Sequence, residues 1–239
     1  MRRMLRRARR SAVQIHGSIA SRLPGALEKH RETWRSRDVA AQMAALAERE
    51  LAAVPESVPP FAAFLRLLPV LVEDDAMPCP ARLLDIGCGV GAYGELVERY
   101  APGRFAYVGA DYSREIIEIA RQRSPARDFV ERDLFAPGAL DGFDVIFASA
   151  LLDVLAEPER ALDVLLGVDA RWMVLHRQRV RAGRCRVGVV RGYRGQTTYS
   201  TTVSQRVLGG AVARSGRRVA ASTHVDGDVW SFLLLRDGC

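Results

Sequence analysis

The chain of 239 residues suits one α/β domain with an extension, rather than two full domains. Its hydrophobic fraction of 49% supports a packed core, and its 26% of charged residues argues against a membrane protein or a disordered chain. The formal net charge is +7, and residues 1–27, which hold seven arginines and no acid, account for all of it. The rest of the chain sums to zero, which argues against nucleic acid as the partner of the folded part.

Residues 1–27 are predicted to form a basic, flexible tail, with contact to an anionic membrane surface as an open alternative. No run of the sequence reaches the roughly 18 apolar residues that a membrane span needs. The four cysteines show no CxxC pair and no zinc-ligand spacing, so no metal site is predicted. A reducing cytoplasm fits these cysteines best.

A helical pattern follows over residues 28–75, where Val39, Met43 and Leu46 recur at a spacing of three to four. A second apolar stretch begins after Pro59 and Pro60, residues typical of a helix start. We predict an N-terminal helical cap over 28–75 and a second domain over 76–239. Trp34 is placed ahead of the first helix, either as a packing residue or as part of a lid that contacts the substrate.

From residue 81 onward, short apolar runs alternate with amphipathic stretches. The expected strands are Arg82–Ile86, Phe105–Ala110, Asp128–Glu131, Asp144–Ser149 and Arg171–His176. The expected helices are Ala92–Tyr100, Arg114–Gln122, Glu159–Leu166 and Val203–Arg214. A final hairpin joins Arg217–His224 to Val229–Arg236. This alternation predicts a doubly wound, mostly parallel sheet with right-handed crossovers.

The first strand runs into a glycine-rich loop with Gly87, Cys88, Gly89 and Gly91, and a helix follows. Glycine allows the tight turn and the close approach of a ligand, and the helix N-terminus offers unpaired N–H groups. Because this spacing also satisfies the dinucleotide fingerprint, the loop alone fits either a nicotinamide cofactor or S-adenosylmethionine (SAM).

Acidic residues at three successive strand ends favour SAM. Asp85, two residues before the first glycine, suits the cationic aminoacyl end of SAM and is an unfavourable neighbour for a pyrophosphate. Asp111 is placed to accept from both ribose hydroxyls, and Tyr112 to lie on the adenine face. Asp133 is expected to accept from the adenine amino group, with Leu134 as an apolar contact.

Three stretches, Leu83–Tyr93, Tyr107–Ser113 and Phe129–Leu134, resemble motifs one to three of the class I SAM-dependent methyltransferases, and most resemble those acting on small molecules. The resemblance implies a seven-stranded sheet of order 3-2-1-4-5-7-6 with an antiparallel last strand. It also implies SAM as cofactor and transfer of the sulfonium methyl group to a nucleophile.

The acceptor side of the site is less defined. Ser149, at the end of strand four, is counted among the cofactor-binding residues. Asp153 is either a polar contact or base, or a helix cap, and His176 is either a general base or a structural histidine. Tyr199 lies in a polar stretch that either lines the acceptor pocket or forms an edge strand.

The favoured function is methyl transfer to an oxygen or nitrogen of a small metabolite. The Asn/Asp-Pro-Pro-aromatic motif of base-directed amino methyltransferases is absent after strand four, which argues against nucleobase chemistry. The alternatives are an RNA methyltransferase anchored by the arginine-rich tail, a nicotinamide-dependent oxidoreductase and a non-catalytic scaffold with a SAM-binding fold. The identity of the acceptor, the need for a base and the oligomeric state are left open.

Overall fold

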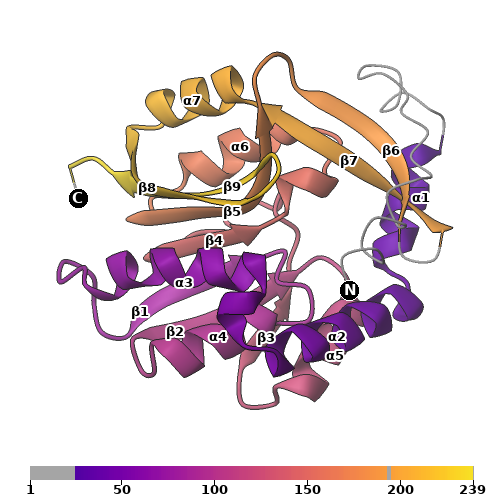
Figure 1. The fold of residues 1–239 in the computed structure, drawn as a ribbon, viewed down its shortest axis with the longest axis horizontal. Coiled ribbons are helices and arrows are strands. Elements are labelled where there is room, and N and C mark those ends of the chain that lie inside the picture. Colours follow the sequence, from indigo (N-terminus) through magenta and orange to yellow (C-terminus); the bar gives the residue numbers. More distant parts are fainter. Residues whose placement is uncertain (1–24, 193–194, 239) are drawn as a thin grey trace.

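The structure, a computed structural model, describes residues 25–192 and 195–238. The basic tail predicted for residues 1–27 lies almost wholly outside these described residues. Figure 1 shows a twisted sheet with helices on both of its faces.

The described helices and strands follow one another in this order. The helices are α1 (Ala26–Trp34), α2 (Arg37–Ala52), α3 (Pro59–Val72), α4 (Ala92–Tyr100), α5 (Arg114–Arg123), α6 (Pro158–Gly167) and α7 (Gln205–Arg214), with 3-10 turns η2 (Pro55–Ser57) and η3 (Leu152–Val154). The strands are β1 (Ala81–Ile86), β2 (Phe105–Asp111), β3 (Asp128–Glu131), β4 (Val145–Ser149), β5 (Trp172–Arg181), β6 (Arg186–Gly192), β7 (Gln196–Ser204), β8 (Arg217–Asp226) and β9 (Val229–Arg236).

The sheet has the predicted strand order. Strands β3-β2-β1-β4-β5 pair in parallel, β9 runs antiparallel to β5, and β8 pairs with β9 at the edge. Since β8 and β9 are the sixth and seventh strands expected from the sequence, the order 3-2-1-4-5-7-6 and the antiparallel last strand are confirmed.

A hairpin of β6 and β7 was not expected. Strand β9 pairs with β5 as far as Arg179, and β7 pairs in parallel with the two residues that follow, Val180 and Arg181. Strand β5 therefore has β9 as its neighbour along most of its length and the β6–β7 hairpin at its end. The prediction that strand five ends at His176 was wrong for the same reason, because β7 and β9 supply partners that carry β5 on to Arg181.

Alternate residues of each central strand face opposite cores. Leu83, Val145 and Phe147 pack with α3 and α4, and Leu84 and Ile146 pack with α6 and α7. A parallel sheet covered on both faces requires strands that are apolar on both sides, which is the pattern of β1 and β4.

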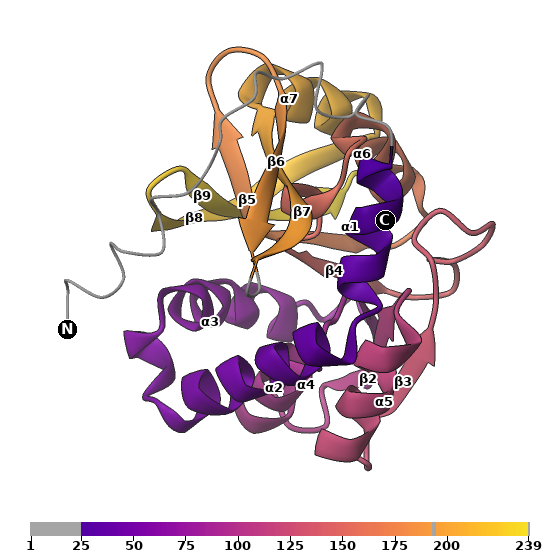
Figure 2. The ribbon, with the colours of Figure 1, turned by 90° about the vertical axis from the view of Figure 1, so that its right-hand side faces the viewer.

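The N-terminal helices take two different positions. Helix α3 packs on the sheet through Phe61, Phe64 and Leu67, while α1 and α2 lie next to β7 and α5 (Figure 2). Trp34 is the last residue of α1, so its expected place ahead of the first helix was wrong. The boundary between a cap over 28–75 and a domain over 76–239 stays a prediction.

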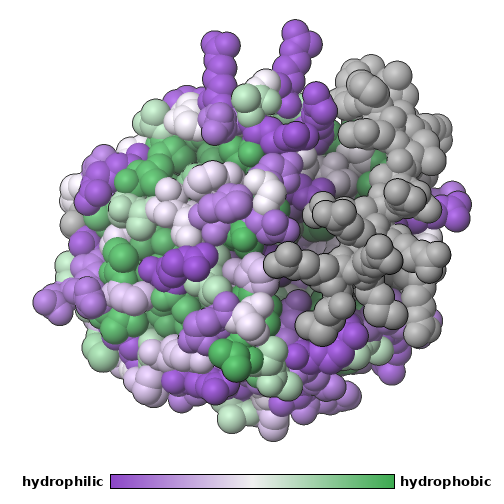
Figure 3. Space-filling view, viewed as in Figure 1, coloured by the Kyte–Doolittle hydropathy of each residue, from purple (hydrophilic) through white to green (hydrophobic). Residues whose placement is uncertain are grey.

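Two surface features complete the description. Within residues 25–192 and 195–238, no helix has the length and apolarity to cross a bilayer. Apolar side chains gather between α7 and the β8–β9 hairpin (Figure 3), where a cavity of about 410 Å³ is lined by residues that include Leu208, Trp230 and Phe232.

Asp74, in the turn after α3, ties that turn to the start of β5. It accepts hydrogen bonds from the Arg171 guanidinium at 2.6 Å and from the indole nitrogen of Trp172 at 2.5 Å. Burial acts to raise the pKa of Asp74, but the hydrogen bonds from Arg171, Trp172 and the backbone of Ala76 hold it below its usual value. The carboxylate therefore stabilises the fold above about pH 4, and this contribution is lost as the pH falls through the lowered pKa.

We expect Asp74→Asn to reduce the free energy of unfolding by about 2 kcal/mol near pH 7, because charge-assisted hydrogen bonds are lost. The difference from the wild-type chain should shrink as the pH falls below about 4. Denaturant unfolding measured at several pH values tests this, with Asp75→Asn, an exposed neighbour, as the matched control. Equal losses for both variants would contradict the assignment.

Candidate active site

A cavity of about 270 Å³ lies at the carboxyl ends of β1, β2 and β4. The glycine-rich loop and the ends of these strands line one side of it, and α1 and α2 line the other. Ligands of doubly wound sheets bind at this edge, where successive loops diverge from the strands.

The glycine-rich loop is held against the end of β2. The backbone N–H groups of Gly87 and Cys88 both donate to the carbonyl of Ala110, at 2.7 and 2.9 Å. Gly87, Gly89 and Gly91 have φ angles of 73°, 55° and 81°, which disfavour other residues. A Cβ atom on Gly91 would lie 2.6 Å from the ring of Phe129, so this turn requires glycine for packing as well.

Asp85 lines the cavity with a carboxylate that is fully buried. The Tyr107 hydroxyl donates to Oδ2 at 2.8 Å, while Oδ1 has no partner among the described residues. Burial raises the pKa of Asp85 to about 7, and the nearby Asp111 adds to this. An unpartnered carboxylate oxygen in a cavity wall fits a cationic or hydrogen-bond-donating ligand group.

Asp111 is held by the backbone on both of its oxygens. Oδ2 accepts from Gly89 N–H at 3.2 Å and Oδ1 from Ser113 N–H at 3.0 Å, so each oxygen keeps a lone pair for a ligand. Burial raises the pKa of Asp111 to about 6, against the effect of these backbone hydrogen bonds. Ser113 also caps α5 by accepting from Ile116 N–H, which fixes the strand-to-helix turn.

The remaining predicted cofactor residues also line this cavity, except Gly91. Gly91 packs against the ring of Phe129 instead. Leu134 is buried and Asp133 is exposed, and they line the cavity on the side of Tyr112. The buried hydroxyls of Tyr112 and Ser149 have no partner among the described residues. The Cys88 thiol donates to the neighbouring carbonyl of Gly89, and burial raises its pKa well above the usual value.

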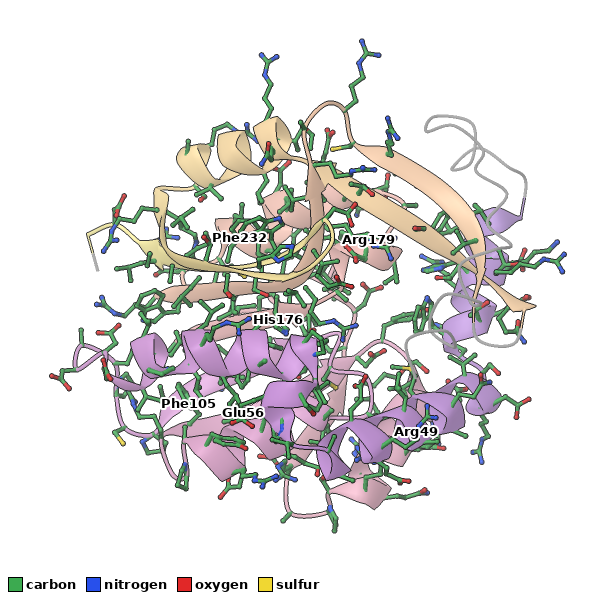
Figure 4. The ribbon with its side chains drawn as sticks, in the orientation of Figure 1. Arg49, Glu56, Phe105, His176, Arg179 and Phe232 are labelled. Carbon is green, nitrogen blue, oxygen red and sulfur yellow. The ribbon has the colours of Figure 1, made fainter. Side chains whose placement is uncertain are left out.

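His176 lies apart from the cavity, in the core between α3 and the sheet (Figure 4). Its Nε2 is 2.9 Å from the Tyr93 hydroxyl and its Nδ1 is 2.8 Å from Ser231 Oγ, so both ring nitrogens are engaged. Burial, and then the charge of Arg177, hold the pKa of His176 well below its usual value. This position argues against His176 as a base acting directly on an acceptor.

Asp153 and Tyr199 also lie outside the cavity lining. Asp153 accepts from the backbone N–H of Arg179 at 2.9 Å and thereby ties η3 to β5. Tyr199 is buried behind His30, with 4.8 Å between the ring centroids. Neither position supports direct contact with a substrate, whereas Trp34 does line the cavity.

The lining residues that were not predicted as site residues include His30, Glu50, Tyr93 and Arg177. A signal for His30 was available, because it stands one helical turn before Trp34 and the Trp34 indole N–H donates to its Nδ1 at 3.3 Å. Arg177 was overlooked beside the more conspicuous His176.

Comparison with known proteins agrees with this geometry. A family model described as a methyltransferase domain matches residues 84–168, the segment from the glycine-rich loop to the end of α6. Residues 84–168 are thus similar to a methyltransferase domain, in agreement with the resemblance of the sequence motifs. The cofactor of that family is SAM, and the unpartnered oxygen of Asp85 and the held carboxylate of Asp111 fit its ammonium and ribose groups.

Similarity in sequence is confined to part of the methyltransferase domain. Trans-aconitate 2-methyltransferases from Rhodopseudomonas palustris and Azoarcus are 33% and 37% identical over 96 and 94 residues, or 40% and 39% of this chain. These segments are 37% and 35% of the relatives' lengths, so the chain spans little more than a third of the curated relatives it matches.

Solved structures resemble a larger share of the chain. A SAM-bound amino pentose methyltransferase of calicheamicin biosynthesis from Micromonospora echinaspora matches with a TM-score of 0.54 and 19% identity, over 81% of this chain and 96% of its own. A sugar N-methyltransferase from Streptoalloteichus matches with a TM-score of 0.53 and 18% identity, over 80% and 91%. At these identities the likeness shows the fold alone.

The predicted role of Asp111 can be tested by replacement. We expect Asp111→Ala to weaken SAM binding by about ten- to a hundredfold, because hydrogen bonds to a charged group contribute about 1.5–3 kcal/mol. Calorimetric titration measures the affinity, and circular dichroism checks that the fold is retained. Asp128→Ala, at the exposed start of β3, is the matched control. Unchanged SAM affinity in Asp111→Ala would remove this residue from the site.

Proposed function

We propose that this protein transfers the methyl group of SAM to an oxygen or nitrogen atom of a small metabolite. The observation that carries the proposal is the cavity itself, which runs from the three strand-end carboxylates to a wall formed by α1, α2 and Arg177. Cofactor and acceptor can therefore share one cavity, as an in-line transfer requires.

Different residues of the cavity are assigned to different parts of the cofactor. We assign the SAM ammonium to Asp85, the ribose hydroxyls to Asp111, and the adenine to Tyr112, Asp133 and Leu134. The backbone of Gly87, Cys88 and Gly89 forms the surface against which the aminoacyl part lies, and the unpartnered hydroxyl of Ser149 faces the same space. When bound, SAM supplies an electrophilic methyl group on a sulfonium.

The cavity is largely apolar beyond its carboxylates. Its lining includes Met43, Leu46 and Ala47 of α2 and Leu151 and Val154 beyond β4. Because the positive charge of the sulfonium is lost as the methyl moves, a wall that solvates charge poorly favours the transition state.

The named activities of the relatives support a small acceptor. One relative is named for methylating trans-aconitate, a carboxylic acid, and a solved structure is named for methylating an amino pentose; neither name mentions nucleic acid. An RNA methyltransferase that uses the arginine-rich tail is the alternative. The predicted cytoplasmic location and membrane-surface contact of the tail also stay predictions.

The purified protein should bind SAM with micromolar affinity or tighter and should release S-adenosylhomocysteine when a suitable small acceptor is present. Calorimetry measures binding, and mass spectrometry detects the methylated product in an extract of small metabolites. Binding without turnover would favour the scaffold, and turnover only on RNA, at an affinity that falls steeply with salt, would favour the alternative.

SAM affinity should depend on pH through Asp85. Because its raised pKa of about 7 must fall when an ammonium binds, SAM binding should release a proton, and affinity should be about tenfold lower at pH 6 than at pH 8. Titrations in buffers of different ionisation enthalpy measure the released proton. Asp85→Asn should bind SAM more weakly and lose most of this pH dependence. A wild-type affinity that is constant between these pH values would contradict the assignment of Asp85.

A further inference from the structure

Two arginines line the cavity, Arg132 and Arg177. Arg132 donates to the carbonyl of Ala139, whereas the backbone directs Arg177 toward the cavity. Arg177 has a φ angle of 55°, unusual for a residue other than glycine, and lies within an irregularity of the β5–β9 pairing between Leu175 and Gln178. Bulges of this kind change the direction in which a side chain points. The next two arginines of β5 are exposed: Arg179, labelled in Figure 4, forms an ion pair with Asp153, and Arg181 forms one with Asp228. Arg177, in contrast, lines the cavity.

The charge of Arg177 is not neutralised by a direct ion pair. No carboxylate of the described residues lies within 4.0 Å of its guanidinium, and the Tyr93 hydroxyl interacts with it. Burial acts to lower the pKa of Arg177, but Tyr93 and the more distant acids Glu50 and Asp153 raise it on balance, so the side chain stays charged. A charged guanidinium without a directly paired anion can bind an anionic ligand group in the cavity.

His30 adds a neutral donor to the same cavity. The Trp34 indole can only donate, so Nδ1 of His30 is the acceptor and the proton of the neutral ring sits on Nε2. Burial, and then the charge of Arg31, lower the pKa of His30 to about 4, which keeps the ring neutral near pH 7. The neutral ring of His30 therefore carries its N–H on Nε2, and Nδ1, which faces both Trp34 and the Thr198 hydroxyl, is not free to act as a base.

The cavity lacks a good base apart from the carboxylates. Burial raises the pKa of Tyr93, His30 is committed as a donor, and Asp85 and Asp111 are assigned to the cofactor. Glu50 is the remaining acid on the α2 wall. An alcohol or ammonium acceptor must lose a proton during methylation, whereas a carboxylic acid is already ionised near pH 7.

We propose that the acceptor is a carboxylic acid whose carboxylate is bound by Arg177, with His30 as a second donor, and that the product is a methyl ester. This inference rests on the proposed methyl transfer and specifies its substrate class. A carboxylate oxygen forms the new bond to the methyl carbon while the methyl–sulfur bond breaks, and the electron pair of that bond stays on sulfur. The negative charge of the acid and the positive charge of the sulfonium cancel, and no proton is released.

Binding to the protein saturated with S-adenosylhomocysteine gives the first test. The probes are acetate, succinate, benzoate and trans-aconitate, each compared with its neutral methyl ester by calorimetry. At least one acid should bind, and its ester should bind at least about tenfold more weakly, because the bidentate charged contact is lost. If no acid binds, or if esters bind as well as acids, the inference is wrong.

Variants assign the contact to Arg177. Arg177→Asn suits the left-handed backbone and should weaken acid binding at least about tenfold, while Arg177→Lys should retain part of it. Arg181→Asn, an exposed arginine of the same strand, is the matched control. Affinity for S-adenosylhomocysteine should be the same in all of these variants. A loss of cofactor affinity in Arg177→Asn would place Arg177 at the cofactor instead and overturn the inference.

Turnover separates this inference from the proposed function. With saturating SAM and the best acid, kcat should be constant between about pH 6 and 9, because the nucleophile stays ionised. A kcat that falls toward pH 6 would indicate a general base and would contradict an ionised acceptor. Methylation of an amino sugar or a phenol but of no acid would refute the inference alone, whereas absence of SAM binding would refute the proposed function as well.

Discussion

The contact between the glycine-rich loop and the end of β2 is the constraint on which the site depends. Two successive N–H groups of the loop share the carbonyl of Ala110, and a third, from Gly89, is held by the Asp111 carboxylate. This arrangement brings the ends of β1 and β2 together and buries Asp85 and Asp111 near each other with no cation between them in the described structure. Burial destabilises such a pair of carboxylates, and the ammonium and ribose hydroxyls of the proposed cofactor would interact favourably with it.

The cavity brings groups of opposite charge together. The carboxylates proposed to hold the cofactor lie at the strand ends, while Arg177 and His30 also line the cavity. A cationic cofactor and an anionic acceptor would each be drawn to the groups of opposite charge. Their opposite charges would then meet across the transferred methyl, where the apolar wall strengthens the attraction between them.

The sequence was sufficient for the sheet and for grouping the candidate cofactor residues, whose roles stay predictions, because both depend on local patterns. Apolar runs, glycines and strand-end acids fix β1 to β4 within a residue or so, and Asp85, Asp111, Tyr112, Asp133 and Leu134 all line the cavity as expected. The acceptor end depends on contacts between distant segments.

His176 illustrates this limit. Its place along β5 is close to the site, but strand alternation and the continuation of β5 turn its ring into the core beside Tyr93. Arg177, one residue later, lines the cavity at an irregularity in the β5–β9 pairing, and no sequence pattern predicts that irregularity. Arginine at every second position, 177, 179 and 181, is the alternation expected of a strand that continues past His176. The pattern was not recognised because arginine is common throughout this chain.

The acceptor wall is built from segments outside the matched domain. Thr33 of α1 donates to the carbonyl of Thr197 in β7 at 2.7 Å, and the ring of His30 rests on Tyr199, so the β6–β7 hairpin holds α1 in place. The family model matches residues 84–168, which excludes α1, α2, Arg177 and this hairpin. The relatives therefore support a small acceptor only in general terms, because the matched family model does not extend to the segments that would recognise it. Substrate choice has to be argued from the charge and donor groups that the hairpin and the N-terminal helices bring to the cavity.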